Sequence, residues 1–402
     1  MKILIISQYF WPENFKINDV VLGLKERGHH VSVLTAKPNY PDGNFSKGYG
    51  FLKTNYEKWN GISIYRTPII RRGNGSSFRL VCNFFSFMIM ASFRVMFIKG
   101  EFDKIFVYEP SPVLVGIPAI VAKYKFKAPI YFWVQDLWPE SISAAGGFKN
   151  KWIIWFVDKI TRRIYHSCKK ILVQSKRFIP YIKNQGIHED KLVYHPNSTE
   201  SFYKPVKLDS EILKTLPTGK KIMFAGNLGE SQSFETLLIS AQILKKRNKK
   251  INWIILGNGR MKSFIKQKIK EFDLEENFIL LGSFPSHDMP KFFSCADALL
   301  VSLKKNPIFS LTIPNKIQSY MACEKPIIAS IDGEGGDIIK ESKSGLVSSA
   351  EDSVGLANNL ELFLKLSKED VNKMSKNSLK FFKNEFDREK LLTKLIHLFD
   401  EK

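Results

Sequence analysis

Apolar runs alternate with amphipathic stretches along the first half of the chain. A continuous apolar run at 2–7 is followed by a helical pattern at about 18–26 and a second apolar run at 30–35. Continuous apolar runs of this kind are typical of parallel strands that are buried on both faces. Further strands are predicted at 104–108, 129–134 and 170–173. The alternation predicts a doubly wound α/β domain.

The same alternation weakens after residue 201 and starts again near residue 220. Strands are predicted at 221–225, 252–256, 278–281, 298–301 and 326–330. We therefore expect a first domain at 1–203, a second at 204–380, and a helical segment at 381–402. Ligands of open α/β sheets bind at the carboxyl ends of the strands, so two Rossmann-like domains facing each other across a cleft are expected.

The composition of the chain indicates in which compartment the protein works and which class of partner it binds. The chain has 402 residues, 61 Lys and Arg against 39 Asp and Glu, and a formal charge of +22. Most of this surplus lies in the first half, which suits polyanions such as nucleic acid, anionic lipid or phosphorylated small molecules. The four cysteines form no CxxC pair, and the apolar start is too short for a signal peptide. We expect a cytoplasmic protein without disulfides or structural zinc.

One segment complicates this picture. Residues 78–99 are dense in Phe and Met, and the uncharged part, 80–93, is only 14 residues long. That length is short for a membrane span, which needs around 20 apolar residues. Two interpretations stay open: a helix buried in the first domain, or an interfacial helix on an anionic membrane. The cations that flank it are Arg71, Arg72, Arg79, Arg94 and Lys99.

Glycines follow two successive predicted strands of the second domain. They lie in Gly226-Asn227-Leu228-Gly229 and in Leu256-Gly257-Asn258-Gly259-Arg260. Glycine lets the backbone approach a ligand and present N–H groups to anions. Neither segment is a complete G-x-G-x-x-G motif, which disfavours a dinucleotide-dependent oxidoreductase.

Residues 306–321 are predicted to be a loop that runs into a helix. Ser310, Thr312 or Asn315 would cap this helix, and Lys316 lies near its start. Free amides beside a lysine form a diphosphate-binding site on electrostatic grounds. An ordinary capped helix start remains the alternative.

In the first domain, acidic and aromatic residues follow two strands. Gln135, Asp136, Trp138 and Glu140 follow one of them, and a loop with Glu13 and Asn14 follows the other. Carboxylates there could recognise hydroxyls or transfer protons, although helix caps or solvated charges are equally compatible. No D-x-D pair near a strand end, G-x-S-x-G, Walker A or H-E-x-x-H motif occurs, so no metal is indicated.

Taken in order, these segments resemble family 4 of the retaining glycosyltransferases of the two-Rossmann (GT-B) type. The resemblance rests on 24–31, 135–136, 196–198, 224–229, 256–259, 281–285 and 318–330. Within the family, 136–141 and Lys316 before 318–320 resemble the bacterial capsule and O-antigen enzymes that add an N-acetyl-6-deoxyhexosamine such as N-acetyl-L-fucosamine.

The resemblance implies a nucleotide-sugar donor in the second domain, an acceptor in the first, cleft closure and a last helix that crosses back to the first domain. Backbone near Phe284 and Pro285 would hold the base, amides of Ser310, Leu311 and Thr312 the diphosphate, and Gln318 the ribose. The expected catalytic residues are Asp136, Glu140, Lys316 and Arg260. The expected donor-binding residues are Lys16, Gly226, Asn227, Gln232, Gly257, Gly259, Phe284, Pro285, Ser310, Leu311, Thr312 and Gln318. The expected acceptor-binding residues are Glu13, Asn14, Gln135 and Trp138.

The chain departs from the family pattern at charged positions. Ser310 and Gln318 stand where relatives carry two glutamates, Asn227 and Gln232 where they carry an Arg and a Lys, and Gln135 where they carry a His. Losing two charge-assisted contacts to the leaving diphosphate costs about 1.5–3 kcal/mol each. We expect Lys316, Arg260 or Lys16 to replace them.

The resemblance, together with the basic first half and the segment rich in Phe and Met, implies a metal-independent glycosyltransferase that uses a UDP-sugar and a polyprenyl-diphosphate-linked acceptor. It would need no cofactor and would lie peripherally on the inner face of the cell membrane. A UDP-sugar 2-epimerase of the same fold is the alternative. A nucleic-acid partner is disfavoured because the basic residues are dispersed and no helix-turn-helix or RNP-like signature occurs.

Overall fold

The computed structural model of the protein describes residues 1–73, 76–141 and 151–401. The chain divides into two compact units, unit 1 with Met1–Pro196 and Leu392–Lys402, and unit 2 with Asn197–Leu391. The sequence predicted a first domain of 1–203 with 381–402, whereas residues 197–203 and 381–391 belong to unit 2.

Unit 1 is built on an eight-stranded sheet of order β3-β4-β2-β1-β5-β6-β7-β8, parallel except for the β3–β4 pair. Its strands are β1 (Lys2–Ile6), β2 (His30–Ala36), β3 (Tyr56–Trp59), β4 (Ile62–Thr67), β5 (Lys104–Glu109), β6 (Ile130–Val134), β7 (Lys170–Val173) and β8 (Leu192–Tyr194). Its main helices are α1 (Lys16–Glu26), α2 (Ser77–Phe97), α3 (Gly116–Phe126), α5 (Lys151–Ser167), α6 (Phe178–Asn184) and α16 (Arg388–Asp400). The predicted doubly wound domain is confirmed, and the β3–β4 hairpin and β8 are additions that the apolar pattern did not reveal.

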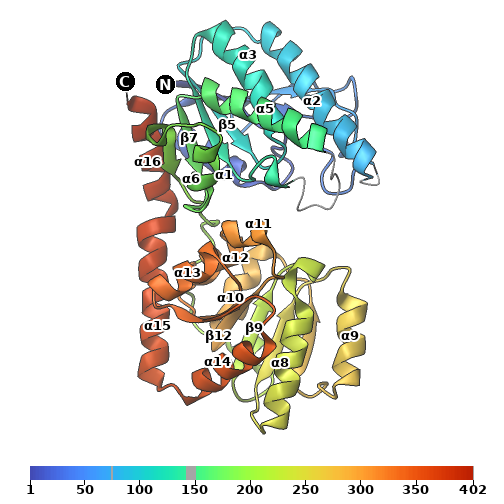
Figure 1. Ribbon diagram of the computed structural model, residues 1–402, viewed down its shortest axis with the longest axis vertical. Coiled ribbons are helices and arrows are strands. Elements are labelled where there is room, and N and C mark those ends of the chain that lie inside the picture. Colours follow the sequence, from blue (N-terminus) through green and yellow to red (C-terminus); the bar gives the residue numbers. More distant parts are fainter. Residues whose placement is uncertain (74–75, 142–150, 402) are drawn as a thin grey trace. The chain divides into compact units, whose positions relative to one another are not determined.

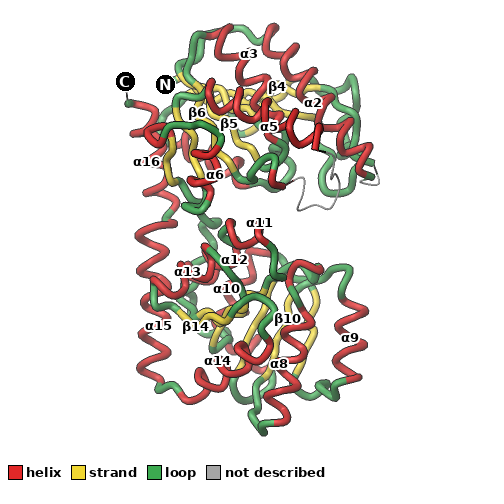
Figure 2. The backbone as a smooth tube through the Cα atoms, in the orientation of Figure 1, coloured by secondary structure: helices red, strands yellow, loops and turns green. Residues whose placement is uncertain are grey.

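Unit 2 has a six-stranded, fully parallel sheet of order β11-β10-β9-β12-β13-β14. Its strands are β9 (Lys221–Ala225), β10 (Asn252–Leu256), β11 (Phe278–Gly282), β12 (Ala298–Ser302), β13 (Ile327–Ser330) and β14 (Gly345–Ser348). Its helices are α7 (Ser210–Thr215), α8 (Phe234–Lys246), α9 (Lys262–Glu271), α10 (Met289–Ser294), α11 (Pro307–Leu311), α12 (Asn315–Ala322), α13 (Glu334–Glu341), α14 (Ser353–Lys365) and α15 (Lys368–Phe381). Figures 1 and 2 show helices on both sides of each sheet.

Alternate residues of the central strands supply two separate cores in unit 2. Met223 and Ala225 of β9 pack with α10, α12 and α13, whereas Ile222 and Phe224 pack with α8, α9 and α14. Successive side chains of a strand point to opposite faces, so a strand that is apolar at every position needs helices on both sides.

The end of the chain returns to unit 1. α15 stops at Phe381, a π-helical turn spans Phe382–Phe386, and α16 follows. Figure 1 shows the course of α16 at the end of the chain. Leu395, Leu398 and Phe399 of α16 are buried against the sheet residues of unit 1. Each such side chain contributes about 1.5–3 kcal/mol when fully buried. This burial explains why the last helix crosses back, as predicted.

Candidate functional site

The carboxyl ends of β9 and β10 are adjacent, and each strand is followed by a glycine, which has no side chain. Gly226 and Gly257, which follow these strands, both have φ near +143°. A Cβ on Gly257 would lie 1.8 Å from the carbonyl oxygen of Gly226, so no other residue fits there without displacement of the backbone. Gly259 and Asn227 also touch at this edge, because a Cβ on Gly259 would lie 2.6 Å from Asn227 Oδ1. The structure therefore brings together four of the predicted donor-binding residues.

Lys316 lies across this glycine-lined edge. It projects from the first turn of α12, and a Cβ on Gly226 would lie 2.7 Å from its Cε atom. Its Nζ donates a hydrogen bond to Gln232 Oε1 and lies 3.6 Å from the centroid of the Phe224 ring. Burial lowers the pKa of the Lys316 amine well below its ordinary value. An anion that bound here would favour the charged ammonium and raise that pKa again.

Gln318 does not lie on the exposed side of α12. It is fully buried, and its Nε2 donates to the carbonyl of Asn197 at 2.9 Å. The predicted contact between Gln318 and a ribose is therefore wrong for this structure. Ser319, one residue later, shares a face with Asn315 and is half-buried. Adjacent residues of a helix point about 100° apart, and residue spacing alone does not reveal which of them is buried.

The predicted loop before α12 is a short helix, α11. Asn306 caps it, since Asn306 Oδ1 accepts from the amide of Ile308 at 2.8 Å. The amide of Ser310 donates to Asn306, and that of Thr312 donates to Phe309. These two amides are already hydrogen-bonded, so the predicted diphosphate contacts of Ser310 and Thr312 are corrected. The contact of the Leu311 amide stays a prediction. The sequence missed α11 because Pro at its first position and the Asn cap look the same in a loop.

Other predicted donor residues lie on the surface of unit 2. The Arg260 side chain is 73% exposed and lies 3.7 Å from the Glu230 carboxylate. Phe284, which follows β11, is exposed and packs on Phe292 with ring centroids 4.4 Å apart. Pro285 is exposed beside it. An exposed aromatic ring and backbone at the end of a strand suit the face of a nucleobase.

In unit 1, the ends of β5 and β6 bring two carboxyl groups together. Glu109 ends β5 and is completely buried, and burial and the nearby Asp136 raise its pKa well above the ordinary value. Burial also raises the pKa of Asp136 to about 6, while a hydrogen bond from Ser111 lowers it. Ser111 has φ of +134°, a strained conformation for a residue with a side chain. The sequence analysis missed Glu109 and Ser111, although Glu109 comes directly after a predicted strand.

The residues around Asp136 divide into buried and accessible ones. Gln135 is buried, its main-chain carbonyl accepting from Gln174 at 2.9 Å, so the predicted contact of its side chain with an acceptor is corrected. Trp138 is half-buried, and its carbonyl accepts from Gln185 at 2.8 Å. Burial raises the pKa of Glu140. Asp136, Trp138 and Glu140 therefore line the carboxyl edge of this sheet.

Glu13 acts inside unit 1. Its Oε1 accepts from the amides of Asn39 and Tyr40 at 2.8 and 2.7 Å, and burial raises its pKa to about 7. The predicted acceptor contact of Glu13 is corrected, because its carboxylate joins the loop after β1 to the loop after β2. Asn14 is exposed, and Lys16 begins α1 in the same unit.

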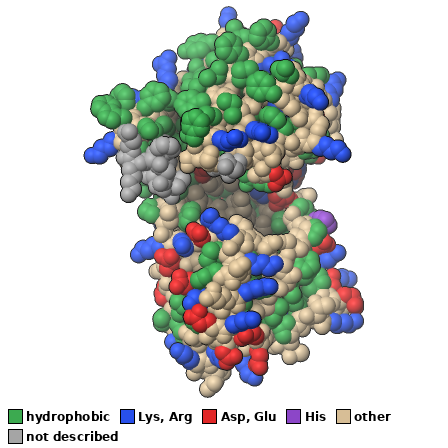
Figure 3. All heavy atoms as spheres, turned by 90° about the vertical axis from the view of Figure 1, so that its right-hand side faces the viewer, with side chains coloured by type: hydrophobic (Ala, Val, Ile, Leu, Met, Phe, Trp, Pro, Cys, Tyr) green, Lys and Arg blue, Asp and Glu red, His purple; other side chains and the backbone are tan. Residues whose placement is uncertain are grey.

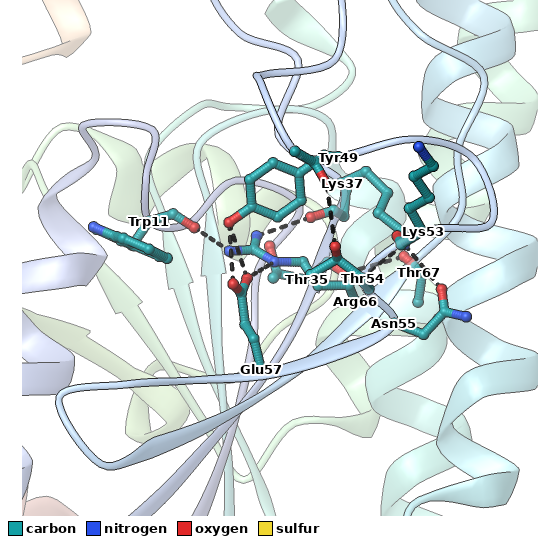
Figure 4. A network of polar contacts seen from close by, with 12 residues as sticks. Trp11, Thr35, Lys37, Tyr49, Lys53, Thr54, Asn55, Glu57, Arg66 and Thr67 are labelled. Carbon is teal, nitrogen blue, oxygen red and sulfur yellow. Dashed lines mark hydrogen bonds and ion pairs between the residues drawn. The ribbon is translucent and has the colours of Figure 1, made fainter.

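A buried ionic network supports the same loops (Figure 4). The Arg66 guanidinium is inaccessible to solvent and bonds Glu57 at 2.6 Å, the Ala36 carbonyl at 3.1 Å and the Trp11 carbonyl. Lys37, also buried, bonds main-chain carbonyls at Lys53 and Thr54. Such buried ionic contacts hold these loops in one conformation, and removing one partner leaves the other as an uncompensated buried charge.

Within the described ranges, no group of three or more His, Cys, Asp and Glu residues is placed to hold a metal ion. Metal independence stays a prediction.

Two family models match the two halves of the chain. The glycosyl transferase 4-like domain matches residues 16–198, and the glycosyl transferases group 1 family matches residues 207–381. Among curated proteins, the chain is 23% identical over 337 residues to the putative colanic acid biosynthesis glycosyl transferase WcaI of Escherichia coli, covering 80% of this chain and 81% of that protein.

Two of the solved structures that share this fold illustrate the similarity. Sucrose-phosphate synthase from Thermosynechococcus elongatus has a TM-score of 0.74 at 16% identity, covering 99% of this chain and 98% of that chain. HepE from Anabaena in complex with UDP has a TM-score of 0.70 at 12% identity, with full coverage of both chains at 100%. These similarities show that this chain has the two-domain GT-B fold.

Proposed function

Because the chain is a glycosyltransferase of family 4 with the GT-B fold, we propose that it moves a sugar from a UDP-sugar to a saccharide carried on polyprenyl diphosphate. Transfer would retain the anomeric configuration and require no metal. The transferred sugar would be an N-acetyl-6-deoxyhexosamine such as N-acetyl-L-fucosamine, in capsule or O-antigen synthesis. The E. coli relative named for colanic acid biosynthesis supports a role in polysaccharide assembly.

The placement of Lys316 carries the donor half of the proposal. The reaction breaks a bond between C1 of the sugar and a phosphate oxygen, so negative charge develops on the departing UDP. Lys316 Nζ lies at the glycine-lined strand ends, where backbone can approach a diphosphate, and Gln232 orients it. The ammonium would neutralise that charge. Arg260, exposed and beside Glu230, would contribute less because water screens it.

The residues at the carboxyl ends of the unit 1 strands support the proposed acceptor site. Asp136, beside Trp138 and Glu140, is the accessible member of the acidic pair with Glu109. We propose that Asp136 accepts a hydrogen bond from the acceptor hydroxyl and orients it. The leaving phosphate oxygen would take the hydroxyl proton, so the new glycosidic bond forms as the bond to UDP breaks.

Binding and product analysis test the proposal in sequence. A thermal-shift series with UDP, GDP and dTDP should raise the unfolding temperature most with UDP, because a ligand at about 100 times Kd adds about 2.7 kcal/mol to the folded state. Proton NMR of the product should show the donor's anomeric configuration. An inverted product contradicts the mechanism, and conversion of UDP-sugar without acceptor would indicate the 2-epimerase alternative. Undiminished transfer in EDTA is expected, and loss of transfer that Mg²⁺ restores contradicts metal independence.

A further inference from the structure

α2 is apolar on the side that faces solvent as well as on the side that faces the sheet. Its buried residues recur every four positions, at Asn83, Phe87, Ala91 and Val95. A second stripe, two residues further along, is exposed. It consists of Phe85, Ile89, Phe93 and Phe97, with exposed fractions of 39%, 47%, 63% and 74%. An offset of two residues turns a helix by about 200°, so the two stripes lie on opposite faces. Burial in unit 1 accounts for only one of them.

The start of α5 adds a second exposed apolar cluster on the same side of the sheet. It consists of Trp152, Ile153, Trp155 and Phe156, with Trp152 exposed by 78%. α3 packs between α2 and α5, and its Tyr124 is also exposed. Figure 3 shows hydrophobic side chains gathered with Lys and Arg over this part of unit 1. We call the exposed residues of α2 together with the start of α5 the helical face.

The helices on this side of the sheet are predominantly basic. Helices α2, α3 and α5 contain eight Lys and Arg and a single acidic residue, Asp158, which pairs with Arg162. On the other side of the sheet, α1 and α16 contain five basic and four acidic residues. An apolar centre with a cationic rim matches an anionic lipid surface, which attracts Lys and Arg and accepts Trp and Phe at headgroup depth.

The three helices run in the same direction, which places the face at the edge that carries the acidic pair. Lys125 of α3 donates to carbonyls at the end of α2, and Lys123 donates to the carbonyl of Ser167 at the end of α5. Their carboxyl termini therefore lie together. Their amino termini, with Phe78 and Trp152, lie at the carboxyl ends of the parallel strands, where Asp136 follows β6.

We propose that α2 and α5 form a docking face by which unit 1 lies on an anionic phospholipid bilayer. The further step, that a lipid-linked acceptor reaches Asp136 along this face, rests on the proposed function. α2 alone among the described helices is long and apolar enough to cross a membrane. It lies on the bilayer instead of crossing it, because Asn83 is buried and bonds both Gln8 at 2.7 Å and the carbonyl of Ile70 at 2.6 Å.

Vesicle flotation of the purified full chain tests the docking face. The protein should float with vesicles of phosphatidylcholine and phosphatidylglycerol at 3:1, at least tenfold less with phosphatidylcholine alone, and less as NaCl rises. Phe85→Ser with Phe93→Ser, and separately Trp152→Ser with Trp155→Ser, should each lower binding at least tenfold. Val354→Ser with Leu362→Ser removes similarly exposed apolar residues from α14 and should leave it unchanged. Circular dichroism checks that each variant is folded.

Quenching by brominated lipid reports the depth. Trp fluorescence should fall more with bromine near the headgroup than with bromine deep in the chains, and the Trp152→Ser, Trp155→Ser variant should lose this quenching. Deep quenching with protease protection of α2 contradicts an interfacial position.

Two further results would overturn the docking face. The first is equal vesicle binding by the face variants and the α14 control. The second is a protein that does not bind vesicles and forms a dimer in light scattering. UDP binding is measured without vesicles, so failure of the proposed function would leave the flotation result standing.

Discussion

Replacing Lys316 with Met removes the cation from the glycine-lined edge of unit 2 and keeps the length and apolar contacts of the side chain. The structure puts the Lys316 amine against Gln232 and the Phe224 ring, where it has few polar partners of its own until an anion binds. Met fills the same space over Phe224. The change therefore alters the charge at the proposed diphosphate site without opening a cavity.

The expected magnitude follows from one charge-assisted contact. Such a contact contributes about 1.5–3 kcal/mol, which corresponds to a loss of about ten- to 150-fold in UDP affinity or in kcat/KM. Isothermal titration gives a second signature. Because burial lowers the pKa of Lys316, the empty site holds a neutral amine above that pKa, and UDP binding should take up as much as one proton per site. Heats measured in buffers of different ionisation enthalpy report this uptake.

Two companion variants make this prediction specific. Gln232→Lys in the Lys316→Met background returns an ammonium to the same place from the neighbouring position and should recover at least tenfold of the lost activity. Arg260→Met removes an exposed cation that already lies near Glu230 and should change kcat/KM by less than about threefold. Near-normal affinity of Lys316→Met, or an equal loss in Arg260→Met, would refute the assignment.

Three other results are expected from unit 1. Protonated Glu13 stabilises the fold; with a pKa of about 7 against an ordinary 4.5, this contribution is complete below pH 4.5 and is lost as pH rises to 7. At about 1.36 kcal/mol per pH unit, the full change in stability is slightly more than about 3 kcal/mol, and urea unfolding of Glu13→Gln should lack this pH dependence. The transfer rate should fall about tenfold per pH unit below pH 6, where Asp136 becomes protonated, and the slower Asp136→Asn should not follow that profile; an identical profile in both excludes Asp136. Glu57→Ala leaves the inaccessible Arg66 guanidinium without its carboxylate and should lower the unfolding free energy by about 3–5 kcal/mol; a loss under 1 kcal/mol would mean that water or main-chain carbonyls already compensate it.

The apolar pattern was sufficient for the architecture because each central strand is buried on both faces. Runs such as 221–225 and 252–256 therefore stand out from their neighbours and became β9 and β10. β3 and β4 were missed because they alternate polar and apolar residues at the sheet edge and include Lys58 and Arg66. Arg66 is typical of a loop or surface residue in the sequence, and its burial is explained only by its pairing with Glu57.

The site was predictable where backbone geometry decides and unpredictable where side-chain direction does. The glycines at strand ends correctly predicted close backbone approach at Gly226 and Gly257, which both have positive φ. Gln318 and Glu13 have the right residue types for ligand contacts but point inward, and a single sequence does not reveal which helical or loop face is covered. Glu109 was overlooked because a Glu directly after a strand is ordinary in a sequence. Its raised pKa comes from burial and from the nearby Asp136, which only the structure reveals.

The most direct measurement is a crystal structure of the full chain with UDP bound. The account predicts both phosphorus atoms beside Gly226 and Gly257, with a β-phosphate oxygen within hydrogen-bonding distance of Lys316 Nζ. The uracil ring should lie near Phe284. Phosphates bound elsewhere on unit 2, or a Lys316 side chain that still bonds only Gln232 with UDP present, would contradict the claim that this lysine supplies the charge for the leaving group.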